Sequence, residues 1–153
     1  MNYRVTKTYG HELGLSACFR QWKAKSHCSK MHGYALSVTL VFECSEYDLD
    51  ETNWVINFGG LKPVKAWLEQ TFDHKTLVAL DDPLFEKFQE MHNAGLIELV
   101  PVYRTGCEAF ATMVFEYVEN WLVENGHASR VKLVSAEVRE HGANSAKYTL
   151  EGV

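Results

Sequence analysis

The chain has 153 residues and a mass of 17.5 kDa, with 46% apolar and 23% charged residues. This composition is typical of a globular protein and excludes disorder as the main state, as well as collagen-like and low-complexity chains. A net charge of −5 argues against nucleic acid as a partner, because such binding relies on a basic surface. The length predicts a single domain over residues 1–153.

The N-terminal residues contain no apolar stretch of the kind found in signal peptides, and Leu36 to Phe42 is too short to span a membrane. The chain has four cysteines without CxxC spacing, at Cys18, Cys28, Cys44 and Cys107. We therefore expect reduced thiols in a cytoplasmic protein that has no membrane partner.

Two strands are predicted in the N-terminal part of the chain. Residues Tyr3 to Ser16 are rich in Tyr, Val and Thr and predict the first strand. The second begins at Tyr34, where apolar and polar side chains alternate. The face expected to be buried carries Tyr34, Leu36, Val38, Leu40 and Phe42. Residues 45–53 are acidic and polar and predict a connector.

Helices are predicted in the middle of the chain. Apolar residues recur at helical spacing from about Gly60 to Phe72, which predicts the first helix. Asp81-Asp82-Pro83 predicts a cap followed by a short helix that ends near residue 92. Residues 96–102 predict a short extended piece, and an amphipathic helix is expected from about Glu108 to Asn125.

Two more strands are predicted over residues 131–140 and 146–151, joined by a loop of turn-forming residues. The first of them is expected to place on one face Val134, Ala136, Val138 and Glu140. The order ββααββ predicts an α+β fold, with a four-stranded antiparallel sheet and two helices on one face. Its exposed edges favour edge-to-edge assembly of subunits.

Cys28 lies in the densest run of reactive side chains, with two histidines and a lysine within a few positions. A thiol near imidazole and ammonium groups can act as a nucleophile or base. A solvated loop that happens to hold these residues explains the run equally well.

Asp73-His74 follows the first predicted helix, and an Asp beside a His can orient the imidazole for proton transfer. A His that satisfies carbonyl groups at a helix C-terminus is the commoner explanation. Glu140 continues an apolar strand face, so it lies either at the rim of the sheet or in a pocket that binds a ligand. Glu108 opens a helix, where acids are common because they match the helix dipole.

Seven histidines invite a search for a metal site. His27 and His32 are five positions apart and His11 lies upstream, but no HExxH, HxH or paired CxxC motif is present. Spacing alone therefore gives a poor metal signal.

Taken together, these segments resemble the family of 6-pyruvoyltetrahydropterin and 6-carboxytetrahydropterin synthases, which adopt the tunnelling fold. The resemblance spans most of the chain in the right order, including the stretch from Trp54 to Lys62 that leads into the first helix. The matching landmarks are Cys28 four residues before His32-Gly33-Tyr34, then Asp73-His74, Glu108, and Glu140-His141 before a loop and Tyr148.

The resemblance implies roles for these residues. Cys28, Asp73 and His74 would form the proton-transfer set, Glu140 would anchor the pterin, and Glu108 would add a contact near it. The implied substrate is 7,8-dihydroneopterin triphosphate. The usual bacterial product is 6-carboxytetrahydropterin, formed with loss of acetaldehyde and triphosphate on the route to 7-deazaguanines such as queuosine. The implied assembly is a homohexamer, a dimer of trimers, with pockets between subunits.

The sequence departs from the family at the zinc site, which normally uses three histidines. Phe19 and Tyr34 occupy two of the three ligand positions, and only His32 matches. Either His27 or His11 joins His32 in a remodelled site, or the metal is lost and two aromatic side chains fill its place. The second explanation is slightly favoured, because both replacements are aromatic.

Three classes of function follow, in decreasing order of preference. The first is a lyase-type pterin synthase with an altered metal site, because the proton-transfer set and the pterin anchor are both kept. The second is a zinc-free pterin- or purine-binding protein on the same fold. The third is a purely structural assembly protein. The segment Leu77 to Thr105 is longer than expected for the family and is a candidate for altered substrate preference.

Overall fold

The computed structural model describes residues 1–152 as a seven-stranded sheet with three α-helices. The strands are β1 (Asn2–Tyr9), β2 (Leu15–Phe19), β3 (His32–Ser45), β4 (Lys75–Ala79), β5 (Leu99–Val102), β6 (Lys132–His141) and β7 (Asn144–Thr149). The helices are α1 (Lys62–Phe72), α2 (Phe85–Asn93) and α3 (Cys107–Glu124), with short 3₁₀ turns at His11–Leu13, His27–Ser29 and Phe58–Leu61.

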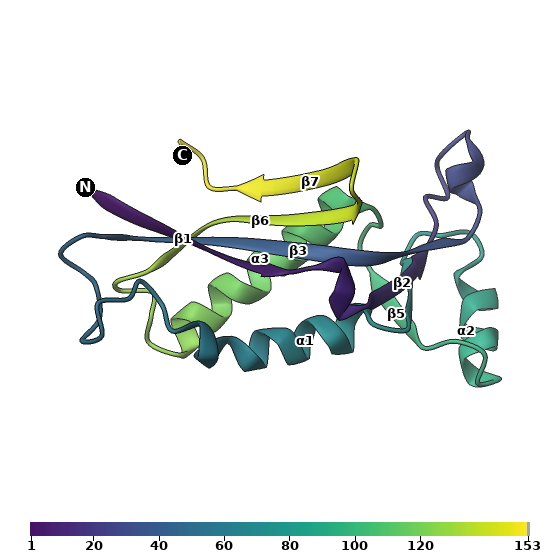
Figure 1. Ribbon diagram of the computed structural model, residues 1–153. Coiled ribbons are helices and arrows are strands. Elements are labelled where there is room, and N and C mark those ends of the chain that lie inside the picture. The colour runs from purple at the N-terminus through teal and green to yellow at the C-terminus, as the bar shows by residue number, and fades with distance from the viewer. Residues whose placement is uncertain (153) are drawn as a thin grey trace.

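The long strand β3 organises the sheet, whose order is β5-β4-β2-β3-β6-β7. Its first half pairs with β2, from Phe19 opposite His32 to Leu15 opposite Leu36. Its second half pairs with β1 on the same edge, and β6 pairs along the other edge. Figure 1 shows β1 and β2 following one another along β3.

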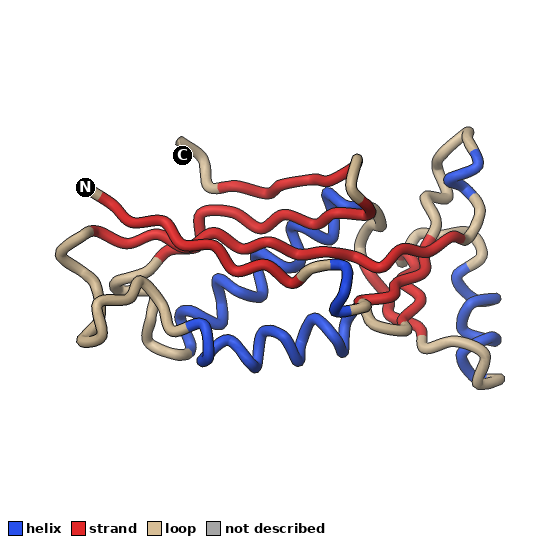
Figure 2. Tube along the Cα trace, viewed as in Figure 1, coloured by secondary structure: helices blue, strands red, loops and turns tan. Residues whose placement is uncertain are grey.

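The core lies between the sheet and two helices. Figures 1 and 2 show α1 and α3 on one face of the sheet, while α2 stands apart beside β4 and β5. The predicted alternation in β3 is confirmed, because Leu36, Val38, Leu40 and Phe42 are all 0% exposed. Against them pack the buried faces of the helices, among them Val64, Leu68, Phe72, Phe110, Val114 and Val118. The predicted α+β class is thus confirmed, with seven strands in place of four.

Two strand predictions differ from the structure. The single strand expected over 3–16 is broken at Gly10 into β1 and β2 by a 3₁₀ turn, which ends at Gly14 with a φ of 75°. The strand β4 was not expected, because its five residues are nearly all buried and show no alternation. It pairs in parallel with both β2 and β5, so the sheet is mixed.

A bulge corrects the predicted face of β6. Val41 pairs with Ser135 and Phe42 with Leu133, so Val134 is an extra residue in the ladder. Leu133 therefore belongs to the core cluster in place of Val134. Val134 is also buried, but outside that cluster. Beyond the bulge, Ala136 and Val138 face the core as predicted. Glu140 follows as a half-buried residue at a second irregularity, where the pairing with β7 steps from Arg139–Ser145 to His141–Asn144.

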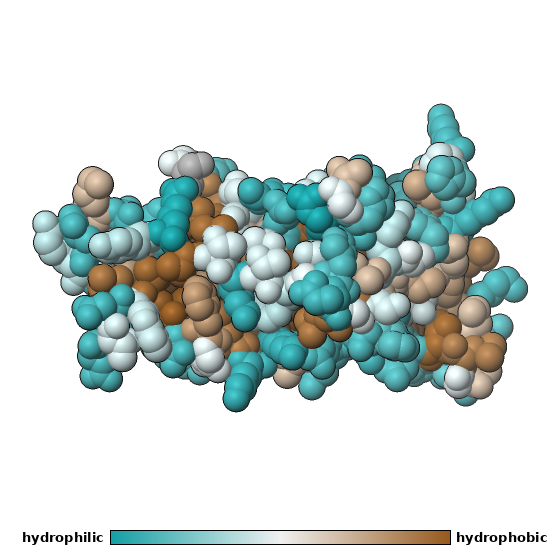
Figure 3. All heavy atoms as spheres, viewed as in Figure 1, coloured by the Kyte–Doolittle hydropathy of each residue, from teal (hydrophilic) through white to brown (hydrophobic). Residues whose placement is uncertain are grey.

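None of the helices within residues 1–152 is both long and apolar enough to cross a membrane. On the face shown in Figure 3, apolar side chains gather at the end of the molecule where β1 begins.

Candidate active site at the end of β3 and β6

Tyr34 is at the centre of the candidate site. It lies two positions after His32 in β3, so the two side chains are on the same face of the strand. The centroid of the Tyr34 ring is 5.4 Å from that of His32 and 5.8 Å from that of His141. Burial raises the pKa of the Tyr34 phenol above its usual value. Nearby charge on Glu140, Cys28 and Cys107 raises that pKa further. The predicted pterin anchor and the predicted catalytic thiol therefore both act electrostatically on the same phenol.

Cys107 is a site residue that sequence reasoning missed. It is the first residue of α3, it is 6% exposed, and burial together with the charge of Glu140 raises its pKa to about 12. Its thiol is thus protonated at neutral pH and suited to donate a hydrogen bond rather than to attack. In the sequence, only its position directly before Glu108, a predicted site residue, could have indicated that Cys107 belongs to the site. Glu108 itself is exposed, and its charge also contributes to the raised pKa of Cys107.

Cys28 lies in the loop that leaves β2 after Phe19 and returns to β3 at His32. The Ser26 hydroxyl accepts a hydrogen bond from the Cys28 N–H at 3.3 Å, which begins the short 3₁₀ turn. The Cys28 carbonyl accepts from the N–H of Gln21 at 3.0 Å. Both backbone groups of Cys28 are therefore held, while its half-buried thiol remains free.

Asp73 and His74 form a hydrogen-bonded pair, as the sequence suggested. His74 Nδ1 lies 2.7 Å from Asp73 Oδ1, and the same oxygen accepts the N–H of Ser16 at 3.3 Å. Burial opposes ionisation of Asp73, but hydrogen bonds from His74 and Ser16 hold its pKa below the usual value. His74 adopts a φ of 57°, and its N–H donates to the Ser16 carbonyl at 2.7 Å. Its side chain is 83% exposed, so the imidazole is directed to solvent.

The two predicted halves of the proton-transfer set are attached to different ends of β2. Asp73 and His74 are bonded to Ser16 near its start, whereas Cys28 belongs to the loop that follows its last residue, Phe19. Within residues 1–152 no hydrogen bond or ion pair joins Cys28 to either residue. One subunit thus gathers Cys28, Tyr34, Cys107 and Glu140, and presents the Asp73–His74 pair separately.

Phe19, His32 and Tyr34, the positions that the resemblance assigns to zinc ligands, lie close together. Phe19 is opposite His32 in the β2–β3 ladder, and the ring centroids lie 5.3 Å apart. Phe19 is 3% exposed and also packs edge-on against Phe110 at 5.0 Å. His32 Nδ1 donates to the Lys30 carbonyl at 2.7 Å, which leaves only Nε2 as a ligand. Among these three packed rings, His32 Nε2 is therefore the one imidazole nitrogen that could bind a metal ion.

The other two candidate ligands do not complete a metal site. His11 Nδ1 donates to the Ala35 carbonyl at 2.5 Å, and His27 is exposed in the 3₁₀ turn next to Cys28. Across the described part of the chain, no group of three or more His, Cys, Asp or Glu side chains could hold a metal ion. The residues at this position do not fit the family's zinc.

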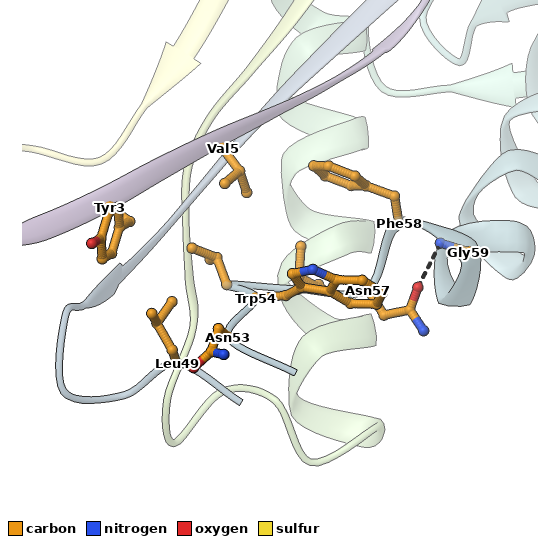
Figure 4. Close-up of a pocket in the computed structure, with 10 residues that line it drawn as sticks. Tyr3, Val5, Leu49, Asn53, Trp54, Asn57, Phe58 and Gly59 are labelled. Atoms are coloured by element: carbon orange, nitrogen blue, oxygen red, sulfur yellow. Dashed lines mark hydrogen bonds between the residues drawn. The ribbon is translucent and has the colours of Figure 1, made fainter. Parts of the chain in front are cut away.

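A separate apolar groove of about 730 Å³ lies between β1 and the connector before α1 (Figure 4). Figure 4 shows Tyr3 and Val5 from β1 facing Trp54 and Phe58 from the connector. The Asn57 side chain accepts the Gly59 N–H at 2.9 Å and shapes the turn into α1. None of the predicted catalytic or anchoring residues lines this groove.

Comparisons with known proteins identify the family and the fold. Residues 10–151 match the family model described as 6-pyruvoyl tetrahydropterin synthase. The fold is similar to that of an uncharacterized protein from Wolinella succinogenes, with a TM-score of 0.79, 19% identity and 99% coverage of both chains. It is also similar to 6-pyruvoyl tetrahydropterin synthase from Plasmodium vivax, with a TM-score of 0.65, 12% identity and 97% coverage of both chains.

The synthase from Caenorhabditis elegans is a further structural relative, with a TM-score of 0.61 and 16% identity over 99% of this chain and 96% of that one. No curated protein matches the sequence significantly. At these identities the solved structures establish the shared fold, and the family model covers nearly the whole chain. The chain belongs to the 6-pyruvoyl tetrahydropterin synthase family.

Proposed function

We propose that the protein is a pterin synthase-like lyase that converts 7,8-dihydroneopterin triphosphate to 6-carboxytetrahydropterin, on a route to 7-deazaguanines such as queuosine. The proposal is supported by the Tyr34 phenol, whose pKa is raised by burial and by the charges of both Glu140 and Cys28. A candidate proton-transfer group and a candidate heterocycle anchor thus belong to one site, as a reaction on a bound pterin requires.

Glu140 suits the anchoring role because it is half-buried near the end of β6. A carboxylate there can accept two parallel N–H bonds from the 2-aminopyrimidinone edge of a pterin. The protonated Cys107 thiol beside it orients the carboxylate without competing for the substrate as a nucleophile. The exposed Glu108, one residue further, supplies an additional contact at the mouth of the site.

Cys28 takes or relays a proton of the substrate side chain, with the Asp73–His74 pair as the second half of the relay. Asp73 fixes the His74 tautomer, since Nδ1–H donates to the carboxylate and Nε2 is left to exchange a proton. The His74 imidazole is exposed, and among residues 1–152 its Nε2 has no proton-exchange partner. In this proposal a neighbouring subunit supplies that partner.

The proposed assembly is a homohexamer built as a dimer of trimers. Its support is the free sheet edges, because in the described chain β1 pairs only with β3, β7 only with β6 and β5 only with β4. Cytoplasmic location is proposed because all four cysteines are free thiols.

We derive no chemical step through zinc, because Phe19 and Tyr34 fill the position with rings. The same observation favours a second candidate function, a zinc-free pterin- or purine-binding protein without synthase activity. The half-buried ring of Tyr34 is compatible with packing on a heterocycle whether or not turnover follows.

One experiment separates the two. Purified protein is titrated calorimetrically with neopterin and incubated with 7,8-dihydroneopterin triphosphate, with product analysis by mass spectrometry. Binding together with 6-carboxytetrahydropterin, acetaldehyde and triphosphate is the result expected for the lyase. Binding without products supports the second candidate, and absence of both overturns the assignment of this site to pterins.

A further inference from the structure

The loop that carries Cys28 is attached to the fold by a buried ion pair between Arg20 and Asp82. Arg20 follows the last residue of β2, and Asp82 lies in the turn between β4 and α2. Arg20 Nε donates to Asp82 Oδ2 at 2.9 Å and Nη2 donates to Oδ1 at 2.6 Å. The two side chains are 18% and 1% exposed. This two-pronged geometry is the strong and directional form of an Arg–carboxylate contact.

The same guanidinium also holds the far end of the loop. Arg20 Nη1 donates to the Ser29 carbonyl at 3.2 Å, one residue beyond Cys28. The Gln21 N–H donates to the Cys28 carbonyl itself at 3.0 Å. Arg20 and its neighbour thereby close the loop on both sides of the thiol.

Arg20 is tied equally to the start of α3. The Thr105 hydroxyl donates to the Arg20 carbonyl at 2.7 Å, and the Gln21 side chain donates to the Thr105 carbonyl at 3.3 Å. Thr105 is two residues before Cys107, the neighbour of Glu140. Arg20 therefore links the loop that carries the Cys28 thiol to the segment that leads to Cys107, beside Glu140.

Asp82 is held as firmly as its partner. Its Oδ1 accepts the Leu84 N–H at 2.9 Å, and the contact with Arg20 keeps the pKa of Asp82 below its usual value. The neighbouring Asp81 instead binds Lys23 at 3.7 Å and the Trp22 indole N–H at 3.2 Å, and both charged side chains there are 60–65% exposed. An exposed pair of that kind is worth little, so Asp81 is a matched control for Asp82.

We propose that Arg20 and Asp82 are positioning residues that set the place of the Cys28 thiol relative to the Glu140 end of the site. Asp82 lies in the segment Leu77 to Thr105, the candidate for altered substrate preference, which thereby contacts the loop that carries Cys28. The effect on turnover rests on the proposed lyase function, whereas the effect on the thiol does not.

The test compares Asp82→Asn with Asp81→Asn in the full-length protein. Iodoacetamide modification of Cys28 is followed at one fixed pH by peptide mass spectrometry. Asp82→Asn is expected to speed modification of Cys28, because the loop loses its anchor, while Asp81→Asn leaves the rate at the wild-type value. Turnover of 7,8-dihydroneopterin triphosphate by Asp82→Asn should fall about 10²-fold in kcat with little change in KM, as expected for a misplaced reacting group.

A second variant guards against simple unfolding. The double substitution Arg20→Met with Asp82→Leu replaces the buried ion pair by apolar side chains, which often preserves stability. It still removes the bond to the Ser29 carbonyl, so fast Cys28 modification and low kcat are expected at a near wild-type melting temperature. Wild-type modification rates in both variants would overturn the positioning role. An inactive wild type would refute only the lyase, because the thiol measurement uses no substrate.

Discussion

The carboxylate of Glu140 lies beside the thiol of Cys107, and burial together with that negative charge raises the pKa of the thiol to about 12. Cys107 therefore keeps its proton in neutral solution and can donate to the carboxylate. Glu140 is half-buried near the end of β6, beside this neighbour.

Replacing Glu140 with Gln should weaken neopterin binding by about 10- to 100-fold, the equivalent of about 1.5–3 kcal/mol for hydrogen bonds to a charged group. Calorimetric titration measures the change. Glu137→Gln is the matched control, because Glu137 lies on the same strand and pairs with Arg139 and Lys147 instead. Equal affinities in the two variants would show that Glu140 is not the anchor.

Replacing Cys28 with Ala should remove turnover of 7,8-dihydroneopterin triphosphate and leave neopterin binding unchanged, because the thiol transfers a proton and does not hold the heterocycle. Cys18→Ala is the control, since Cys18 is a half-buried β2 residue whose pKa is raised by burial. Turnover and binding are measured on the same preparations. Surviving turnover in Cys28→Ala would exclude Cys28 as the base.

Phe19→His combined with Tyr34→His should create a zinc site, because positions 19, 32 and 34 already converge across the β2–β3 ladder. Elemental analysis of untagged protein should give about one zinc per subunit for the double variant and far less for the wild type. Adding His32→Ala should abolish the uptake. A wild-type protein with stoichiometric zinc would instead mean that other ligands, such as His27 or His11, join His32.

The buried phenol of Tyr9 predicts an alkaline loss of stability. Burial raises the pKa of Tyr9 from 10.0 to about 12, so the folded state holds the phenolic proton more tightly than the unfolded state. This contribution is complete below pH 10 and disappears as the pH rises through 12. Melting temperatures of Tyr9→Phe should decline less than those of the wild type across that window.

The hydroxyl of Tyr9 also lacks a hydrogen-bond partner in the described structure. At neutral pH, Tyr9→Phe should therefore leave the free energy of unfolding unchanged or raise it by about 1 kcal/mol or less. The exposed Tyr3→Phe is the control for both measurements. A large loss of stability in Tyr9→Phe would show that the hydroxyl has a partner after all.

Local sequence patterns were sufficient to predict a strand where only one of its faces is buried. The alternation from Leu36 to Phe42 identified the central strand, and the same kind of pattern placed Ala136 and Val138 on the core face of β6. The Asp73–His74 pair was predictable because adjacent residues form it.

Features that depend on distant pairing were not predictable in the same way. The strand β4 pairs with β2 and β5 and packs against α1 and α2, and four of its five residues are buried, so its sequence shows no alternation. The bulge at Val134 follows from the register with β3 rather than from the residue itself. Cys107 joins the site only because α3 begins beside the end of β6, and Arg20 meets Asp82 across 62 positions of sequence.

The most direct test of the central claim is the product of one reaction. Untagged protein, dialysed against a chelator, is incubated with 7,8-dihydroneopterin triphosphate, and the mixture is analysed by liquid chromatography with mass spectrometry. We predict consumption of the substrate with formation of 6-carboxytetrahydropterin, and no such product with Cys28→Ala. An unchanged substrate with the wild-type protein would contradict the lyase assignment.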